Sequence, residues 1–182
     1  MAEASHPTRG RLLEVGLALA ESGSLAATSV NHIIDAAGVS KGAFYVHFKD
    51  RQAYLAALHR TFYDSINAEI RTAMSAHPPG ARRLRSGAEA YLDACLRSRG
   101  VRAMLVDVRT EPSTMDQMNA NVDTFTEVAA ADLRALALPE PMATARLFVA
   151  MVREVAIAEL ARGSRDPQLR QALWYLGRIE SI

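Results

Sequence analysis

The chain has 182 residues with 49% hydrophobic and 23% charged side chains, a formal net charge of +1 and one cysteine, Cys95. It is long enough to fold unaided, as one medium domain or as a small domain joined to a larger one. A single cysteine excludes an internal disulfide. The net charge lacks the large basic surplus that is typical of many nucleic-acid-binding proteins, so an argument for DNA binding must rest on local groups of residues. We expect a cytoplasmic protein, because no cationic leader opens the chain and charges interrupt its most apolar stretch, residues 147–160.

Four helices are predicted in the first half of the chain. Apolar residues at helical spacing favour helices at about 8–22, 29–37, 41–48 and 50–74. Hydroxyl or carboxylate residues at their starts are expected to cap them, with Thr8 as the cap of the first. The fourth and longest helix ends before a cluster of helix-breaking residues and is the expected connector to the rest of the chain.

A short turn joins the second and third helices. Gly38 follows the second helix, and its lack of a Cβ permits the left-handed conformation that ends a helix. Ser40 then caps the third helix, since its side-chain oxygen can accept from the amides of the next turn. Two helices joined by a turn of about 3–4 residues form a helix-turn-helix. In such a unit the second helix lies in the major groove of DNA, with its first residues against base edges.

The third helix has the composition that this role needs. Lys41 can reach a guanine edge or a phosphate, Gly42 lets the backbone approach DNA, and the Ala43 methyl can touch a thymine methyl. Phe44 and Phe48 are four residues apart, so both are expected to face the core. The opposite face of the helix is therefore left for contact.

Residues 8–55 resemble the DNA-binding domain of the tetracycline-repressor (TetR) family of transcriptional regulators. The resemblance rests on the run Gly38–Asp50 and on the second helix, with Thr28, Ser29, Val30, Ile33, Ile34, Ala36 and Ala37. It implies an all-α fold with a helix-turn-helix domain at residues 1–52 and a helical ligand-binding and dimerisation domain at residues 53–182. It also implies a sequence-specific regulator, expected to be a repressor that a small-molecule effector releases from its double-stranded DNA operator.

The resemblance assigns DNA contacts to helix starts and to the third helix. The expected residues are Thr8, Thr28, Ser29, Ser40, Lys41, Gly42, Ala43, Tyr45, His47 and Lys49. For the hydroxyl residues, plain capping explains the pattern as well as phosphate contact does, and both interpretations stay open. For Tyr45, His47 and Lys49 the alternative is a packed tyrosine, a surface histidine and a solvated lysine.

Three positions depart from the family pattern. Ala20 stands where a bulky aromatic residue is usual, and Gly16 stands where alanine is usual. Glycine inside a helix costs about 0.5–1 kcal/mol relative to alanine, so we expect Gly16 to lower stability slightly. Val46 follows the tyrosine where an aromatic or polar residue is common, so any reading of DNA by this side chain must be apolar.

Five more helices are predicted in the second half, which makes about nine in all. Their approximate bounds, set by glycine and proline breaks, are 81–97, 101–109, 114–136, 142–161 and 167–180. Asp166 is expected to cap the last helix, because Pro167 follows it in the first helical position.

A small-molecule pocket among these helices is implied by the resemblance more than by the residues. The candidates to line it are Tyr91, Cys95, Met104, Met115, Met118, Phe125 and Phe148. Methionine adapts to apolar ligands, although the same residues at helical spacing are more often core. A cationic ligand becomes the expectation if Asp107, Asp116 or Asp123 points inward. No cofactor, metal ion or catalytic residue is expected.

The last two helices favour a homodimer. Small residues allow close approach of helices, and the final helix is apolar on more than one face. Two helices from each subunit would form a four-helix bundle through Ala150, Ala156, Leu169, Leu173, Trp174 and Leu176. Alternatively, these side chains only close the core of the monomer.

Two other classes of function can be weighed against a regulator. A helical enzyme is disfavoured, because none of the five histidines pairs with the cysteine or a carboxylate at metal-ligand spacing, and no phosphate-binding glycine loop is present. An interaction or adaptor protein, with a degenerate helix-turn-helix that does not bind DNA, is the alternative.

Overall fold

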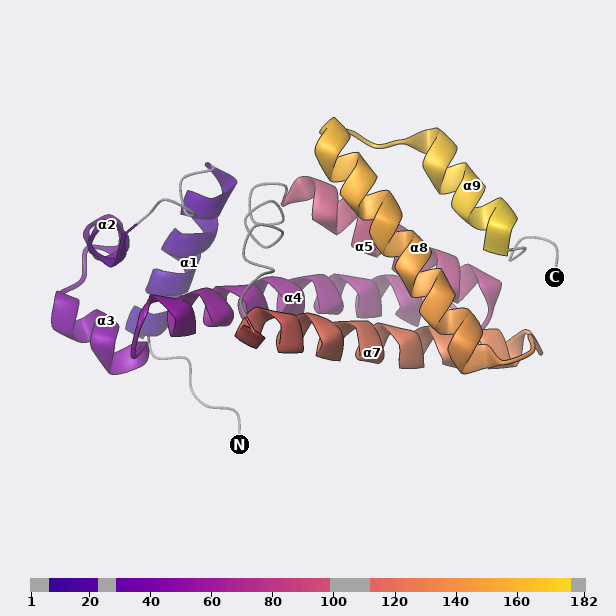
Figure 1. The fold of residues 1–182 in the computed structure, drawn as a ribbon, viewed down its shortest axis with the longest axis horizontal. Helices are drawn as coiled ribbons and strands as arrows, with labels where there is room; N and C mark the ends of the chain where they lie inside the picture. The colour runs from indigo at the N-terminus through magenta and orange to yellow at the C-terminus, as the bar shows by residue number, and fades with distance from the viewer. Residues whose placement is uncertain (1–6, 23–28, 99–111, 178–182) are drawn as a thin grey trace. The chain divides into compact units, whose positions relative to one another are not determined.

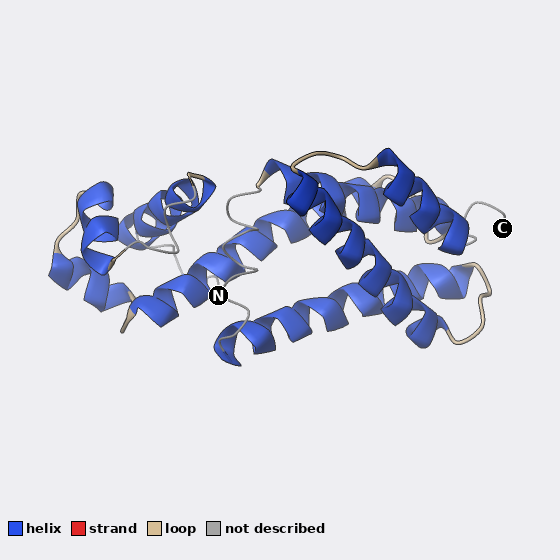
Figure 2. Ribbon diagram, turned by 45° about the horizontal axis from the view of Figure 1, so that its top comes forward, coloured by secondary structure: helices blue, strands red, loops and turns tan. Residues whose placement is uncertain are grey.

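The computed structural model describes residues 7–22, 29–98 and 112–177, and every regular element in these ranges is a helix (Figure 1, Figure 2). The predicted all-α fold is confirmed. The predicted helix at 101–109 lies outside the described residues. The eight described helices are α1 (Pro7–Glu21), α2 (Val30–Ala37), α3 (Lys41–His47), α4 (Arg51–Ser75), α5 (Ala81–Arg97), α7 (Pro112–Ala135), α8 (Pro141–Arg162) and α9 (Pro167–Gly177).

The helix bounds follow the capping pattern of the sequence, with one correction. Asp50 precedes α4, and its Oδ1 accepts from the backbone N–H of Ala53 at 2.7 Å. Asp166 precedes α9, and its Oδ1 accepts from the N–H groups of residues 168 and 169 at 3.0 Å each. Thr8, however, already lies inside α1, which begins at Pro7, so it is not the residue before the helix.

The described residues divide into two compact units. The first unit, up to Asp64, holds α1, α2, α3 and the first part of α4. The second unit begins at Ser65 and holds the remainder of α4, α5, α8, α9 and α7 from Met115 onward. The division falls within the 25 residues of α4, so this one helix contributes side chains to both units.

An aromatic cluster forms the core of the first unit. The rings of Phe44, Phe48 and Tyr54 lie with their centroids 5.1 to 5.5 Å apart, at the distances expected of packed aromatic pairs. The hydroxyl of Tyr54 donates to the carbonyl oxygen of Leu12 at 2.8 Å, which joins α4 to α1. Burial raises the pKa of Tyr54 well above its ordinary value, so this hydroxyl stays protonated.

Gly16 makes this arrangement possible. A Cβ at position 16 would lie 2.0 Å from the hydroxyl oxygen of Tyr54 and 2.8 Å from the two methyl carbons of Leu58. From the sequence alone, Gly16 is expected only to lower the stability of the helix slightly. The structure adds a gain, because the missing methyl group leaves the space that the Tyr54 hydroxyl occupies.

A buried ionic cluster joins three helices of the second unit. Arg170 of α9 is 3% exposed, and its Nε and Nη2 donate to the carboxylate of Glu159 in α8 at 2.7 and 2.8 Å. Its Nη1 donates to Glu89 and Asp93 of α5 at 2.5 and 2.7 Å. Burial alone lowers the pKa of Arg170, but the hydrogen bonds to these carboxylates outweigh burial and raise it. The guanidinium thus fixes α9 against both α5 and α8.

Candidate DNA-binding surface and ligand cavity

The turn between α2 and α3 has the geometry of a helix-turn-helix. Gly38 is left-handed with φ 62°, and its N–H donates to the carbonyl oxygen of Asp35 at 3.1 Å. The N–H of Val39 donates to the carbonyl oxygen of Ile34 at 3.2 Å, so the last carbonyls of α2 are satisfied. Ser40 Oγ accepts from the N–H of Ala43 at 3.1 Å and caps α3. The predicted stop and start of these two helices are confirmed.

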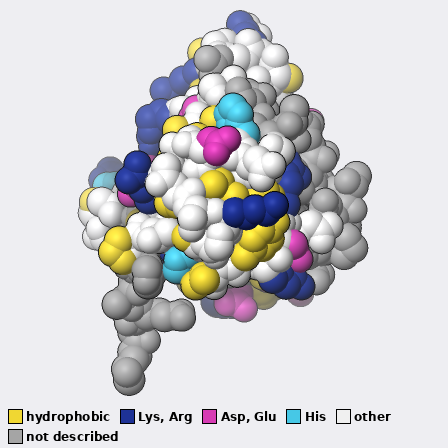
Figure 3. Space-filling model, turned by 90° about the vertical axis from the view of Figure 1, so that its left-hand side faces the viewer, with side chains coloured by type: hydrophobic (Ala, Val, Ile, Leu, Met, Phe, Trp, Pro, Cys, Tyr) yellow, Lys and Arg dark blue, Asp and Glu magenta, His cyan; other side chains and the backbone are white. Residues whose placement is uncertain are grey.

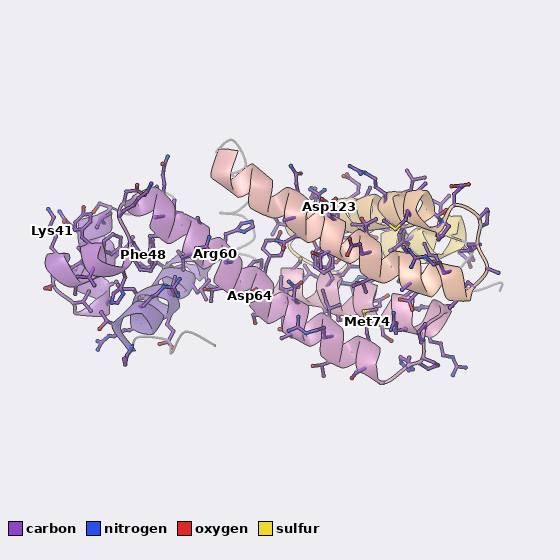
Figure 4. The ribbon with its side chains drawn as sticks, turned by 90° about the horizontal axis from the view of Figure 1, so that it is seen from below. Lys41, Phe48, Arg60, Asp64, Met74 and Asp123 are labelled. Carbon is purple, nitrogen blue, oxygen red and sulfur yellow. The ribbon has the colours of Figure 1, made fainter. Side chains whose placement is uncertain are left out.

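The two faces of α3 differ sharply. Phe44 and Phe48 are buried in the aromatic core, as predicted, and fix the helix to the first unit. The opposite face is open: Lys41 is exposed, Tyr45 is 46% exposed and Val46 is 79% exposed. In Figure 4 Lys41 lies at the outer edge of the first unit and Phe48 lies in its interior. The buried face holds the helix while the outer face stays available for contact.

Most of the residues expected to touch DNA are accessible to solvent. Ser29, Ser40, Gly42 and Lys49 are exposed, and Ala43 and His47 are half-buried. Ser29 caps α2 by accepting from the N–H of residue 32 at 3.3 Å, so the capping interpretation holds for this hydroxyl. Thr28 lies outside the described residues. Contact of any of these residues with DNA stays a prediction.

Positive charge lies next to the open face of α3 although the net charge of the chain is nearly zero. The only two lysines of the sequence, Lys41 and Lys49, flank α3. Lys49 Nζ lies 3.8 Å from a carboxylate oxygen of Asp50, a long and exposed pair that leaves the ammonium accessible. Figure 3, which looks onto the α2 and α3 end, shows basic and apolar side chains lying next to one another.

Two arginines of α1 lie beside the helix-turn-helix, at places that the sequence did not indicate. The guanidinium carbon of Arg9 lies 5.6 Å from the ring centroid of Phe48, within the range of a cation–π contact. A Cβ at Gly38 would lie 3.3 Å from Nη2 of Arg11, so this guanidinium is beside the turn. Sequence spacing gives no signal for these contacts, because they join segments about 30 to 40 residues apart along the chain.

The second unit contains an apolar cavity of about 60 Å³ between α4, α5, α7 and α8. It includes three of the predicted pocket residues, Tyr91, Phe125 and Phe148, and the first two have ring centroids 5.8 Å apart. The residues that the sequence did not single out are mostly aliphatic or small: Ile70, Met74, Leu84, Gly87, Ala88, Val128, Ala129, Val149, Val152 and Arg153. Their residue types also fit ordinary core, so sequence alone does not separate them from it.

The other predicted pocket residues are not brought to this cavity. Cys95 is buried in α5 but does not line the cavity. Met104 lies outside the described residues, as do the side chains of Met115 and Met118. Asp123, which would favour a cationic ligand if it pointed inward, is exposed on α7 (Figure 4). Asp107 and the side chain of Asp116 are outside the described part.

The residues expected in the dimer interface divide into two groups. Ala156, Leu173 and Trp174 are buried within the single chain, and the Trp174 ring lies 6.1 Å from that of Phe148. Ala150, Leu169 and Leu176 are exposed. An interface through α8 and α9 must therefore use the exposed group, to which the structure adds Leu147 and Tyr175.

The described ranges contain neither a cluster of metal-ligating side chains nor a helix able to span a membrane. No group of three or more histidine, cysteine, aspartate or glutamate side chains there is placed to hold a metal ion. None of the helices in these ranges combines the length and the apolar character needed to cross a bilayer.

Comparison with known proteins links the first unit to a family of regulators. Residues 12–58 match the family model described as bacterial regulatory proteins, tetR family. The chain is also 31% identical over 122 residues to the HTH-type transcriptional activator FasR of Mycolicibacterium smegmatis. That match covers 65% of this chain and 55% of the activator, so it spans little more than half of the relative's length.

Solved structures extend the similarity to the whole fold. A transcriptional regulator from Rhodococcus sp. Rha1 is 27% identical with a TM-score of 0.79, and the match covers 95% of this chain and 96% of that one. The reduced form of Escherichia coli NemR is 18% identical with a TM-score of 0.74, covering 96% and 97% of the two chains. At that identity, NemR supports the fold alone.

Proposed function

We propose that this chain is a member of the tetR family of bacterial regulatory proteins, and that it regulates transcription by binding a specific DNA operator as a homodimer. The relatives are described as regulators and not as enzymes, in agreement with the sequence prediction. The observation that carries the proposal is the open face of α3, where Lys41, Gly42 and Tyr45 are exposed while buried phenylalanines hold the helix in place. This is the arrangement that a recognition helix needs to enter the major groove.

A binding experiment on the DNA upstream of the protein's own gene tests this proposal. The full chain is titrated onto labelled duplex at several salt concentrations, and an unrelated duplex serves as the reference. Lys49→Gln is expected to weaken binding to both duplexes and to lower the salt slope by about one unit, because one phosphate contact is lost. Lys41→Gln is expected to reduce the preference for the specific duplex, since its side chain lies at the first turn of α3.

A matched control separates these effects from a general loss of charge. Arg82→Gln removes one positive charge from an exposed position of α5 in the second unit, and it should leave both affinities unchanged. Equal binding of wild-type protein to both duplexes would exclude a sequence-specific regulator, and no binding to either duplex would favour the adaptor alternative. Loss of affinity in Arg82→Gln as large as in Lys49→Gln would exclude the proposed docking of α3.

We further propose that the protein is a repressor and that a small molecule in the cavity releases it from DNA. Helix α4 supports this coupling, because it begins directly after the helix-turn-helix and its residues Ile70 and Met74 line the cavity. A ligand that shifts α4 would weaken DNA binding by the same factor by which DNA weakens ligand binding. The relative FasR is described as an activator, so the sign of regulation needs its own test. Transcription in vitro from the upstream region is expected to fall when the protein is added, and a rise would establish activation.

A further inference from the structure

The described residues that line the cavity of the second unit include one charged side chain, and that side chain is a cation. Twelve of the thirteen lining residues are apolar, aromatic or glycine, and the thirteenth is Arg153 of α8. Among the residues that the structure describes, none that lines the cavity carries a carboxylate. The electrostatics of the wall therefore favour an anionic ligand over a cationic one.

Among the described residues, Arg153 has no partner of the kind that several other arginines of this unit have. Four of these arginines form ion pairs with carboxylates: Arg170, Arg165, Arg97 and Arg83. In the part of the chain that the structure describes, no residue forms an ion pair or a hydrogen bond with Arg153. Its neighbours three and four positions away on α8 are uncharged: Val149, Ala150, Ala156 and Ile157.

A guanidinium in this position is suited to a carboxylate. Arg153 is half-buried, and the side chains of the cavity wall beside it offer few polar groups to replace water. A planar carboxylate can accept two parallel hydrogen bonds from a guanidinium, and such charge-assisted pairs are strong where the surroundings are apolar. The long arginine stem can line an apolar wall while its charged end stays near the opening.

The size of the cavity restricts the apolar part of the ligand. Its volume of about 60 Å³ is less than half of the roughly 150 Å³ of a protein cavity that binds benzene. An unbranched alkyl chain, which is thinner than a ring, therefore enters with the least displacement of the wall. Met74 is the adaptable group: it lies against Gly87, where a Cβ would be 2.8 Å from the methionine sulfur.

We propose that the cavity binds an alkyl carboxylate, with the chain among the side chains of α4, α5, α7 and α8 and the carboxylate on Arg153. This inference rests on the proposed function, because it names the chemical class of the effector in the same cavity. The ligand enters with its chain first, and the unpaired guanidinium of Arg153 receives its acid group.

The test uses the full chain without DNA, and hexanoate, octanoate and decanoate as probes, each compared with its uncharged amide. Binding is followed by calorimetry and by the emission of Trp174, the only tryptophan, whose ring lies 6.1 Å from the cavity residue Phe148. At least one carboxylate is expected to bind about tenfold more tightly than its amide. Arg153→Gln should remove the preference for the carboxylate while leaving the affinity for the amide unchanged. Arg82→Gln should leave both the preference and the affinity unchanged.

Several outcomes would overturn the inference. These are no binding by any of the three carboxylates, equal affinity for acid and amide in the wild-type protein, or an unchanged preference in Arg153→Gln with its fold verified by circular dichroism. Failure of the proposed function is distinguishable from these results. If the carboxylate binds through Arg153 but leaves DNA affinity unchanged, the effector mechanism fails and the site stands. If DNA affinity responds only to uncharged or cationic compounds, the regulator stands and the carboxylate site fails.

Discussion

At position 16 a hydrogen atom in place of a methyl group leaves room for the hydroxyl of Tyr54, which donates to the carbonyl oxygen of Leu12. Both groups are buried in the first unit, and the hydrogen bond satisfies a hydroxyl that would otherwise be costly to remove from water. The glycine and the tyrosine are therefore to be understood as a pair. Helix propensity accounts for the cost of the glycine but not for the space that it leaves for the tyrosine.

This pairing predicts the effect of Gly16→Ala. In an ordinary helix this change stabilises by about 0.5–1 kcal/mol. Here we expect a net loss of about 1–3 kcal/mol, because the new Cβ would lie 2.0 Å from the Tyr54 hydroxyl and the core is overpacked. Urea denaturation, followed by circular dichroism, measures the free energy of unfolding.

A second substitution identifies the cause. Tyr54→Phe removes the clashing oxygen, so Gly16→Ala should cost less in the Tyr54→Phe background than in the wild-type protein. A Gly16→Ala variant as stable as the wild type, or a cost unchanged by Tyr54→Phe, would contradict the assigned role of the glycine.

At the scale of elements, α9 depends on one buried side chain. The guanidinium of Arg170 joins α9 to Glu159 of α8 and to Glu89 and Asp93 of α5. Glu159 is fully buried, and its Oε1 also accepts from the backbone N–H of Asp166 at the start of α9. Without the arginine this carboxylate has no compensating cation, and its negative charge remains in an apolar interior.

We therefore expect Arg170→Met to destabilise the second unit by about 3–5 kcal/mol, in the range found when one partner of a buried ion pair is removed. The double variant Glu159→Leu/Arg170→Met should recover much of this loss, because it leaves no unpaired charge at that position. Thermal and urea unfolding give the comparison.

Arg165→Met provides the control for this prediction. Arg165 forms a 2.8 Å ion pair with Glu89 but is largely exposed, so its removal should cost no more than about 1 kcal/mol. Equal losses in Arg165→Met and Arg170→Met would show that burial is not what makes the Arg170 cluster important.

At the scale of the whole molecule, the proposed dimer accounts for exposed apolar side chains on the last two helices. Leu147 of α8 and Leu176 of α9 are 68% and 75% exposed, and Tyr175 is 67% exposed. Side chains of this size are commonly covered by a partner when they gather on one surface. Two recognition helices about 34–36 Å apart, as successive major grooves require, also need a second subunit.

The dimer predicts the behaviour of Leu147→Glu/Leu176→Glu. Light scattering should give twice the mass of the 182-residue chain for the wild type and the mass of one chain for the variant. Affinity for a two-half-site operator should fall by at least about tenfold, since each subunit then binds a half-site alone. Ala68→Glu, at an exposed position of α4, adds one negative charge elsewhere and should leave the mass unchanged. A monomeric wild-type protein at micromolar concentration would exclude the homodimer.

Local interactions account for what could be predicted. Helix periodicity and capping act between residues a few positions apart, so the sequence located the turn at Gly38, the caps Ser40, Asp50 and Asp166, and the helix over residues 81–97. The burial of Phe44 and Phe48 followed from their four-residue spacing. Helix α1 begins at Pro7, one residue before the predicted start, a difference of the size expected at helix termini.

The sequence by itself determined the helical class, the helix-turn-helix and the open face of α3, because each depends on spacing within one or two turns. Only the tertiary structure decided that Gly16 accommodates Tyr54, that Arg170 is buried, that Arg153 lines the cavity, and which apolar residues of α8 and α9 remain exposed. These features depend on which helix faces which, and that choice is made by contacts between residues far apart along the chain.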